Sequence, residues 1–341
     1  MNSEWLEFLA SRPPMDGTPD CALVDLSHLG AVVTKGVSVH LGLIRASGAE
    51  AAVFLQGQLT NDTRLISPTR AQITAWCSPK GRMMASFLAF QYGDDLYLQL
   101  GAERLESVLK RLRLYVLRTR VELADASASL ARVGLAGDCA AAILGDALPG
   151  EPFAVRRHGD LGIVRLPGDR PRVEIVGPVP AVRAFWERVE GRAARATPEL
   201  WSLLDIRAGV PAVFEETADA FVPQMANLQL IDGVSFTKGC YTGQEVVARM
   251  QYLGKLKRRM YYARIPASAV PPPGTDLFAT GSESGQGSGK IVAAARSPEG
   301  GVEALAVVEV AGAEGGEVRL GAPDGPILAF GQLPYAFSAD A

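Results

Sequence analysis

The chain is organised around one stretch, Phe236-Thr237-Lys238-Gly239-Cys240-Tyr241-Thr242-Gly243-Gln244-Glu245-Val246-Val247-Ala248-Arg249. Lys238-Gly239 predicts a tight turn, because glycine tolerates positive φ. Thr242 and Glu245 have the spacing of a capping box, which predicts a helix that starts there and continues through Arg249.

The same stretch places a cysteine directly before the predicted helix. Cys240 follows Lys238 by two residues, and both the lysine and the helix N-terminus favour a thiolate. A small, buried cysteine that only packs in the turn is an equally good interpretation. The spacing alone leaves both alternatives open.

Length and composition are those of a globular protein with more than one domain. The chain has 341 residues, with 48% hydrophobic and 21% charged residues. A formal net charge of -3 gives no overall attraction to nucleic acid or to anionic membranes. Residues 1–14 lack the basic and apolar regions of a signal peptide, and we find no apolar run long enough to span a membrane. We therefore expect a cytoplasmic protein.

The cysteines and histidines predict neither a disulfide framework nor a metal site. The four cysteines are scattered without a C-x-x-C pair, and no two of the three histidines have metal-ligand spacing. We expect reduced thiols and no bound metal.

The hydrophobic pattern divides the chain into segments of different character. Short strands are expected at 31–34, 37–41, 72–77, 84–91 and 96–100, with helices near 50–59 and over 102–118. From 128 to 197 the order strand, helix, three strands, helix is typical of a ferredoxin-like module. A helix at 198–208 carries Trp201, and the irregular stretch 209–237 is long enough to be functional.

Several short strands after residue 254 predict a small β-barrel or sandwich. The first of these strands directly follows a basic run formed by Lys255, Lys257, Arg258 and Arg259. The glycines of 281–289 predict a flexible loop and do not fit a dinucleotide-binding fingerprint, because no helix follows them.

The eight residues from Lys238 to Glu245 resemble the signature of the YgfZ family, folate-binding proteins linked to iron–sulfur proteins and to tRNA modification. The resemblance continues in 56–62, 79–82 and 221–228, and it covers most of the chain from about 22 to 335. The relatives of this family include the T protein of the glycine-cleavage system and a mitochondrial factor for iron–sulfur enzyme maturation.

The resemblance implies an α+β fold, a three-domain cloverleaf like that of the glycine-cleavage T protein. The first domain would be discontinuous, with residues 22–127 and 198–254. Residues 128–197 would form the ferredoxin-like domain and 255–341 a small C-terminal β-barrel.

The resemblance also implies a site for tetrahydrofolate in a central cavity between the three domains. The indole of Trp201 would support the flat pterin ring. Cys240 would be a functional thiol held near the cavity, and no metal would be needed. The other implied folate-binding residues are Gln56, Asn61, Asp62, Gln224, Asn227, Tyr241, Glu245 and Arg249.

The chain departs from the pattern of its relatives at three positions. Leu41 stands where a second aromatic is expected. Arg207 replaces an acid that grips the pterin in the aminomethyl-transferring relatives, and it would pair with the folate tail or face solvent. The strand after Arg82 lacks a catalytic carboxylate, having Ala85 and Ser86 there, so nothing would stabilise the cation formed in aminomethyl transfer.

Three functional hypotheses follow. The leading one is a folate-dependent accessory protein for the assembly, repair or maintenance of iron–sulfur enzymes, which would be its partners together with cluster-assembly proteins. The second is a folate-dependent one-carbon transferase with Asp62 or Glu245 as its acid. The third is a tRNA-binding module that uses the basic run, although a solvated strand edge explains that run better.

Overall fold

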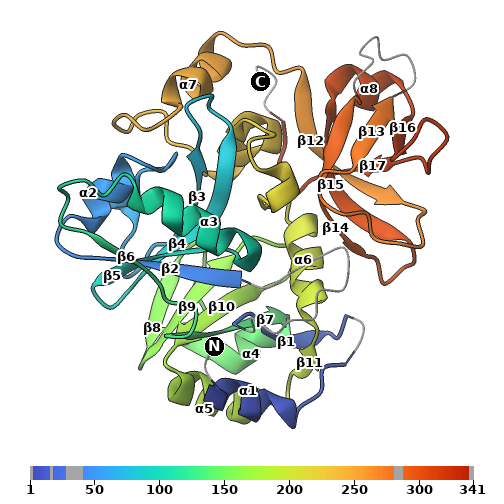
Figure 1. The fold of residues 1–341 in the computed structure, drawn as a ribbon. Helices are drawn as coiled ribbons and strands as arrows, with labels where there is room; N and C mark the ends of the chain where they lie inside the picture. Colours follow the sequence, from blue (N-terminus) through green and yellow to red (C-terminus); the bar gives the residue numbers. More distant parts are fainter. Residues whose placement is uncertain (1–2, 16–17, 28–40, 280–286, 338–341) are drawn as a thin grey trace.

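Three β-sheets, each built mainly from one part of the chain, make up the fold (Figure 1). The mixture of these sheets with helices confirms the expected α+β class. The computed structural model describes residues 3–15, 18–27, 41–279 and 287–337. The strands expected at 31–34 and 37–40 and the loop residues 281–286 lie outside the described residues.

The first sheet has five strands in the order β3-β4-β5-β2-β6. In β5, leucines alternate with Tyr97 and Gln99, so the leucines pack toward helices α2 and α3 while Gln99 points to the opposite face. The elements of this part are β2 (Leu41–Ser47), α2 (Ala51–Gln56), β3 (Gln72–Cys77), β4 (Met83–Tyr92), β5 (Asp95–Gly101), α3 (Ala102–Arg113) and β6 (Glu122–Asp125).

The middle sheet has six strands in the order β11-β1-β7-β10-β9-β8. In β10, Val173 and Ile175 join the apolar cluster beneath helices α1 and α5, whereas Arg172 and Glu174 point to the other face. The elements are α1 (Ser3–Ala10), β1 (Cys21–Asp25), β7 (Ala131–Gly137), α4 (Cys139–Leu144), β8 (Val155–His158), β9 (Leu161–Leu166), β10 (Arg172–Gly177), α5 (Val179–Val189) and β11 (Ala194–Ala196).

Strand β1 corrects two expectations. It pairs with β7 and β11, so it belongs to the middle sheet although the expected first domain begins at residue 22. The pairing also brings Cys21 beside the start of α4, where it forms a disulfide with Cys139 across a Cα–Cα distance of 5.7 Å. The sequence did not predict this bond because 118 residues separate the two cysteines.

The C-terminal sheet has six strands in the order β16-β13-β14-β15-β12-β17, and it curls into a half-barrel (Figure 1). Its inner face is apolar and contains Leu277, Ile291 and Val308. The elements are β12 (Arg258–Ile265), β13 (Asp276–Ala279), β14 (Gly289–Arg296), β15 (Val302–Glu309), α8 (Val310–Gly315), β16 (Val318–Leu320) and β17 (Ala329–Gly331).

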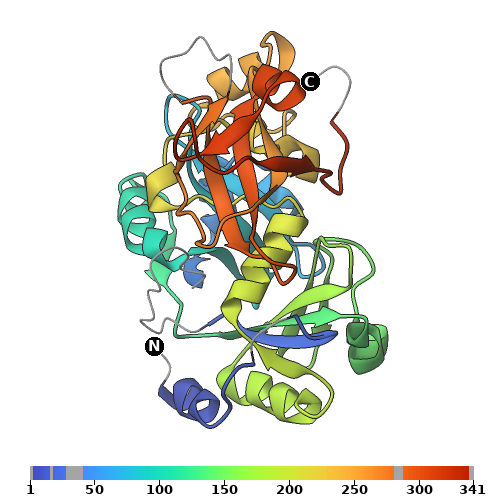
Figure 2. The same ribbon diagram turned by 90° about the vertical axis from the view of Figure 1, so that its right-hand side faces the viewer.

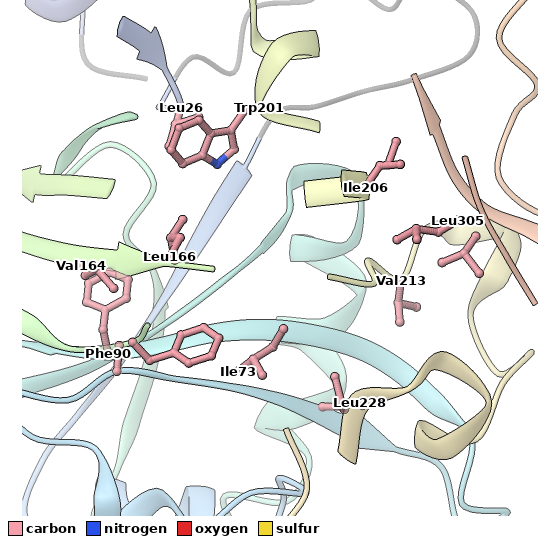
Figure 3. Close-up of a cluster of buried hydrophobic side chains, with 14 of the residues drawn as sticks. Leu26, Ile73, Phe90, Val164, Leu166, Trp201, Ile206, Val213, Leu228 and Leu305 are labelled. Atoms are coloured by element: carbon pink, nitrogen blue, oxygen red, sulfur yellow. The ribbon is translucent and has the colours of Figure 1, made fainter. Parts of the chain in front are cut away.

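Helix α6 (Pro198–Arg207) runs between the C-terminal sheet and the middle sheet, as Figure 1 and Figure 2 show from two directions. A single apolar cluster joins all three sheets along this helix. Figure 3 shows residues of this cluster, among them Trp201 and Ile206 from α6, Ile73 from the first sheet and Leu305 from the C-terminal sheet. The helix therefore joins the three parts of the molecule.

The segment after α6 contains short 3-10 turns, Pro223–Ala226 and Leu228–Ile231, and then leads into α7 (Gln244–Tyr252). Asn227 and Asp232 take left-handed conformations where these turns end. Among the described residues, no helix is both long and apolar enough to cross a membrane.

Candidate functional site

The signature turn enters α7 through Gly243, whose φ is 82°. A Cβ on this glycine would lie 2.3 Å from the carbonyl oxygen of Ser78 and 2.9 Å from Cα of Gly81. The basic turn 78–82 and the signature turn therefore cross in backbone contact. Only glycine permits both this approach and this φ.

Two expectations about the local structure of this turn are wrong. The helix begins where expected, but its N-cap is Gly243 and no side chain caps it, so Thr242 and Glu245 form no capping box. The backbone of the turn 78–82 lies so close to the N-cap position that only glycine fits there, and glycine has no side chain to cap the helix. The positive φ expected at Gly239 occurs at Gly243 instead.

Lys238 is buried and connects the signature turn to the loop before β3. Its ammonium donates to three backbone carbonyls, those of Gln56 at 2.6 Å, Leu59 at 2.5 Å and Asn61 at 3.1 Å. These bonds use all three of its N–H donors. Burial lowers the pKa of Lys238 to about 8. The three donors of this lysine are therefore used by backbone carbonyls of the fold.

Cys240 is a free, exposed thiol, whereas the adjacent Tyr241 is buried with its ring 5.0 Å from the Lys238 ammonium. Glu245 and Arg249 are exposed on α7. Figure 1 shows α7 at the edge of the molecule beside the β3–β4 hairpin. This geometry makes the thiol accessible to a macromolecule.

The polar residues of 56–62 bond mainly within their own neighbourhood. Gln56 accepts from the amide and hydroxyl of Thr63 at 2.8 Å and 2.9 Å. Asn61 donates to the carbonyls of Ile73 and Asp232 at 3.0 Å and 2.5 Å. Hydrogen bonds from Arg64 lower the pKa of Asp62 to about 2. The loop is thus held by structural bonds.

The side chains of Gln224 and Asn227 also form hydrogen bonds to the protein backbone. The amide of Gln224 donates to the carbonyl of Val247 in α7 at 2.7 Å, and that of Asn227 donates to Met260 in β12 at 2.8 Å. Both side chains are buried. They join the irregular segment to the helix and to the C-terminal sheet.

A cavity of about 110 Å³ lies where the first sheet, the middle sheet and α6 meet. Trp201 lines it with an indole that is 2% exposed. The ring lies against Gly134 of β7, where a Cβ would come within 2.4 Å of Cζ3. Among the described lining residues none comes from the C-terminal sheet, and of the expected site residues Trp201 alone is included.

Two charged residues of β10 form the polar wall of this cavity. Arg172 donates from Nε to the carbonyl of Pro167 at 2.6 Å and pairs through Nη2 with Asp205 of α6 at 2.8 Å. Its guanidinium lies 5.3 Å from the Trp201 ring centre. Glu174 accepts through Oε2 from Gln99 of β5 at 2.8 Å.

Glu174 is held in an environment that disfavours its charge. Burial raises the pKa of Glu174 to about 7, although the neighbouring Arg132 opposes the rise. Arg132 donates in turn to Gln99 at 2.9 Å, so the network joins the middle sheet to the first sheet.

Arg207 is partly exposed, and its guanidinium forms an ion pair within the protein. It forms a two-point pair with Glu303 of β15, at 2.8 Å and 2.6 Å. Tyr262 and Ser297 also donate to this carboxylate, each at 2.8 Å. Arg207 therefore fastens α6 to the C-terminal sheet.

Strand β4 brings no carboxylate to the cavity. Ala85 is buried and is not among the lining residues, whereas Ser86 and the next two residues, Phe87 and Leu88, line the cavity wall. The Ser86 hydroxyl accepts a bond from the amide of Val213 at 3.2 Å. Leu41, which replaces the expected second aromatic, also lines the cavity.

The basic run overlaps the start of β12, and two of its residues, Arg258 and Arg259, make contacts within the C-terminal part. Arg258 pairs with Glu309 at 3.1 Å, and the guanidinium of Arg259 lies 4.4 Å from the ring centre of Phe337. Lys255 and Lys257 remain exposed. The cationic surface is smaller than the sequence suggested.

The structure thus separates two features that the sequence placed in one site: an exposed thiol on the signature turn and a ring-sized cavity at Trp201. The sequence analysis missed Arg172, Glu174 and Asp205. A signal was present, since two charges alternate with valine and isoleucine in β10, which is unusual for a buried strand. Among the described residues no cluster of acidic, cysteine or histidine side chains could hold a metal ion.

Relatives named tRNA-modifying protein YgfZ match nearly the whole chain. The protein from Hamiltonella defensa is 33% identical, over 78% of this chain and 80% of its own length. The one from Sodalis glossinidius is 33% identical, over 86% and 90%. The one from Yersinia pseudotuberculosis is 31% identical, over 95% and 98%. No family model matches the chain.

Among solved structures, the glycine cleavage system aminomethyltransferase T from Bartonella henselae is similar, with a TM-score of 0.70. The match covers 97% of this chain and 88% of that protein at 20% identity, which shows a shared fold. The cloverleaf expectation is therefore confirmed. With 31–33% identity to its relatives over most of its length, the chain belongs to the YgfZ family.

Proposed function

We propose that this protein is a cytoplasmic, folate-dependent accessory protein for iron–sulfur enzymes, including those that modify tRNA. Relatives named tRNA-modifying protein YgfZ and the T-protein fold support the proposal. The observation that carries it is the cavity at Trp201, where an indole face lies beside buried polar groups.

Tetrahydrofolate is the proposed ligand of this cavity, and the residues present fit its ring end. An indole is a good platform for a flat heterocycle, and Arg172 and Glu174 offer polar atoms beside it. The volume of about 110 Å³ is below the roughly 300–1,000 Å³ of ordinary ligand pockets. The pterin ring would therefore lie inside and the remainder of the folate outside. When bound, the folate would supply a carrier for one-carbon units.

Cys240 is the proposed functional thiol, acting on a partner protein. Its exposure beside α7 supports contact with an iron–sulfur enzyme or a cluster-assembly protein. It is not among the residues that line the Trp201 cavity. This favours a thiol that meets partners over one that accepts a one-carbon unit inside the cavity.

Complementation tests the proposal. A strain that lacks its own family member would receive the wild-type gene, Cys240→Ala or Trp201→Ala, and the activity of its iron–sulfur enzymes would be measured. We expect wild type to restore activity and both variants to fail at equal protein level. A Cys240→Ala protein that restores full activity would refute the role of the thiol.

One-carbon transfer remains as a second candidate because the cavity does contain carboxylates. Asp62 and Glu245, the expected acids, do not line it, but Glu174 and Asp205 do. An assay of one-carbon exchange with methylene- or aminomethyl-folate separates the two functions. Tight binding without exchange would exclude the transferase.

A further inference from the structure

Three buried polar atoms at the cavity wall have no hydrogen-bond partner among the described residues: Oε1 of Glu174 and both Nη1 and Nη2 of Arg172. Nη2 lies 2.8 Å from Asp205 as an ion pair, so Oε1 of Glu174 and Nη1 of Arg172 are the two atoms for which the described residues supply neither a hydrogen bond nor an ion pair. Their side chains are 1% and 2% exposed, and both line the Trp201 cavity. Leaving a buried donor or acceptor unpaired costs about 1–3 kcal/mol, so such atoms are uncommon in natural proteins. A ligand in the cavity would satisfy both.

The remaining polar atoms of the two side chains are fixed by the protein. Gln99 holds Oε2 of Glu174, while Pro167 and Asp205 hold Nε and Nη2 of Arg172. The two residues lie on one face of β10, yet the described residues include no ion pair between them. One acceptor and one donor with neither a hydrogen bond nor an ion pair among the described residues therefore belong to side chains on the same face of β10.

The indole is positioned next to this pair by the strand that adjoins β10. Gly134 of β7 is the register partner of Glu174, and its missing side chain makes room for the ring of Trp201. A planar ring stacked on the indole would present its edge toward β10. The edge must offer an N–H to the carboxylate and an oxygen to the guanidinium.

We propose that Glu174 and Arg172 read the N–H/C=O edge of a cyclic amide ring stacked on Trp201, and so select 4-oxo pterins over 4-amino pteridines. This rests on the proposed folate function. In a 4-oxo pterin, N3–H donates to Glu174 and O4 accepts from Arg172. A 4-amino ring reverses both groups, placing donor against donor and acceptor against acceptor.

In this proposal the residues that bind the ring edge come from β10 and not from α6. The position of the pterin-binding acid in the aminomethyl-transferring relatives is Arg207 here, and its guanidinium is bound to Glu303. Asp205, one half-turn earlier, holds Arg172 in place and is a positioning residue.

Calorimetric titration of the full chain with folic acid and aminopterin, which differ mainly in the 4-oxo or 4-amino group, tests the proposal. Wild type should bind folic acid at least about tenfold more tightly, the loss expected for mispaired buried groups. Glu174→Gln should reduce the preference, because an amide can present either a donor or an acceptor to N3 while Arg172 still discriminates at position 4. Glu187→Gln, an exposed helix residue, is the matched control.

The outcomes separate this inference from the proposed function. Equal wild-type affinity for the two compounds would overturn the inference even if tetrahydrofolate binds, and this arm needs no variant to fold. Binding of 6-methylpterin with the 4-oxo preference, but no binding of tetrahydrofolate, would support the inference and refute the folate function. Failure to bind any of these compounds would refute both.

Discussion

Two arginine–glutamate clusters flank α6, and they differ in what the protein leaves unpaired. In the Arg207–Glu303 cluster, Arg207, Tyr262 and Ser297 supply four hydrogen bonds to the carboxylate. In the cavity cluster, Oε1 of Glu174 and both Nη atoms of Arg172 lack a hydrogen-bond partner among the described residues, and only Nη2 has an ion pair, with Asp205. The two clusters contain the same residue types, but they differ in how many of their polar atoms are hydrogen-bonded within the protein.

The pKa values of the two glutamates, Glu303 and Glu174, are shifted in opposite directions. Burial alone would raise the pKa of Glu303, but bonds from Arg207, Tyr262 and Ser297 outweigh it and lower the pKa to about 2. At Glu174 burial dominates and raises the pKa to about 7. We call the Arg207–Glu303 cluster closed, because its hydrogen bonds stabilise the charged carboxylate. We call the cavity cluster of Arg172 and Glu174 open, because its carboxylate lacks a further hydrogen-bond donor.

The largest effect is expected from opening the closed cluster. Arg207→Met should destabilise the protein by about 3–5 kcal/mol, because it leaves the buried Glu303 carboxylate without its cation. Urea unfolding measures the loss. The double variant Arg207→Met/Glu303→Gln should recover much of it, and a single-variant loss below about 1 kcal/mol would contradict the structural role of the pair.

Acid should weaken the closed cluster. The pKa of Glu303 is lower in the folded than in the unfolded state, so its contribution to stability is complete above its ordinary pKa of 4.5 and is lost as the pH falls toward about 2. The loss amounts to about 3 kcal/mol. Glu303→Gln should remove this component from the pH dependence of the free energy of unfolding. If the free energy of unfolding depends on pH in the same way in wild type and in Glu303→Gln, the proposed contribution of Glu303 is contradicted.

The open cluster should show the reverse dependence. Because the folded pKa of Glu174 is raised from 4.5 to about 7, the folded state keeps a proton that the unfolded state has lost. Stability should therefore fall by up to about 3 kcal/mol as the pH rises through this window. Glu174→Gln should flatten the curve between these values. Saturating folate should also reduce the fall, since it supplies a donor to the carboxylate.

A smaller effect is expected from filling the space beneath the indole. Gly134→Ala places a Cβ about 2.4 Å from the Trp201 ring, so the ring must shift. We expect a stability loss of about 1–3 kcal/mol and weaker folate binding. Gly191→Ala, where a Cβ would meet nothing within 4 Å, is the control. Unchanged folate affinity in Gly134→Ala would show that the ring position is unimportant.

The sequence predicted the parts of the molecule that depend on local pattern or on the family signature. These include the three sheets and the helix after the signature turn. It did not predict the use of Lys238, whose carbonyl partners lie 177 to 182 residues away. Nor did it predict the open pair of β10, because its character arises only where β5, β10 and α6 meet.

The hydrogen-bond partners of the expected site residues could not be predicted from the sequence either. Gln56, Asn61, Gln224 and Asn227 are polar, buried and part of motifs, which is equally typical of ligand contacts and of structural bonds. Only the partner atoms distinguish the two, and these come from distant segments.

The central claim is that folate binds at Trp201 while the thiol acts elsewhere. Titration of tetrahydrofolate into folded Trp201→Ala and Cys240→Ala proteins tests it most directly. We predict that Trp201→Ala weakens binding by about tenfold or more, the value of a lost stacking contact, and that Cys240→Ala binds like wild type. Loss of binding in Cys240→Ala together with wild-type affinity in Trp201→Ala would contradict the account.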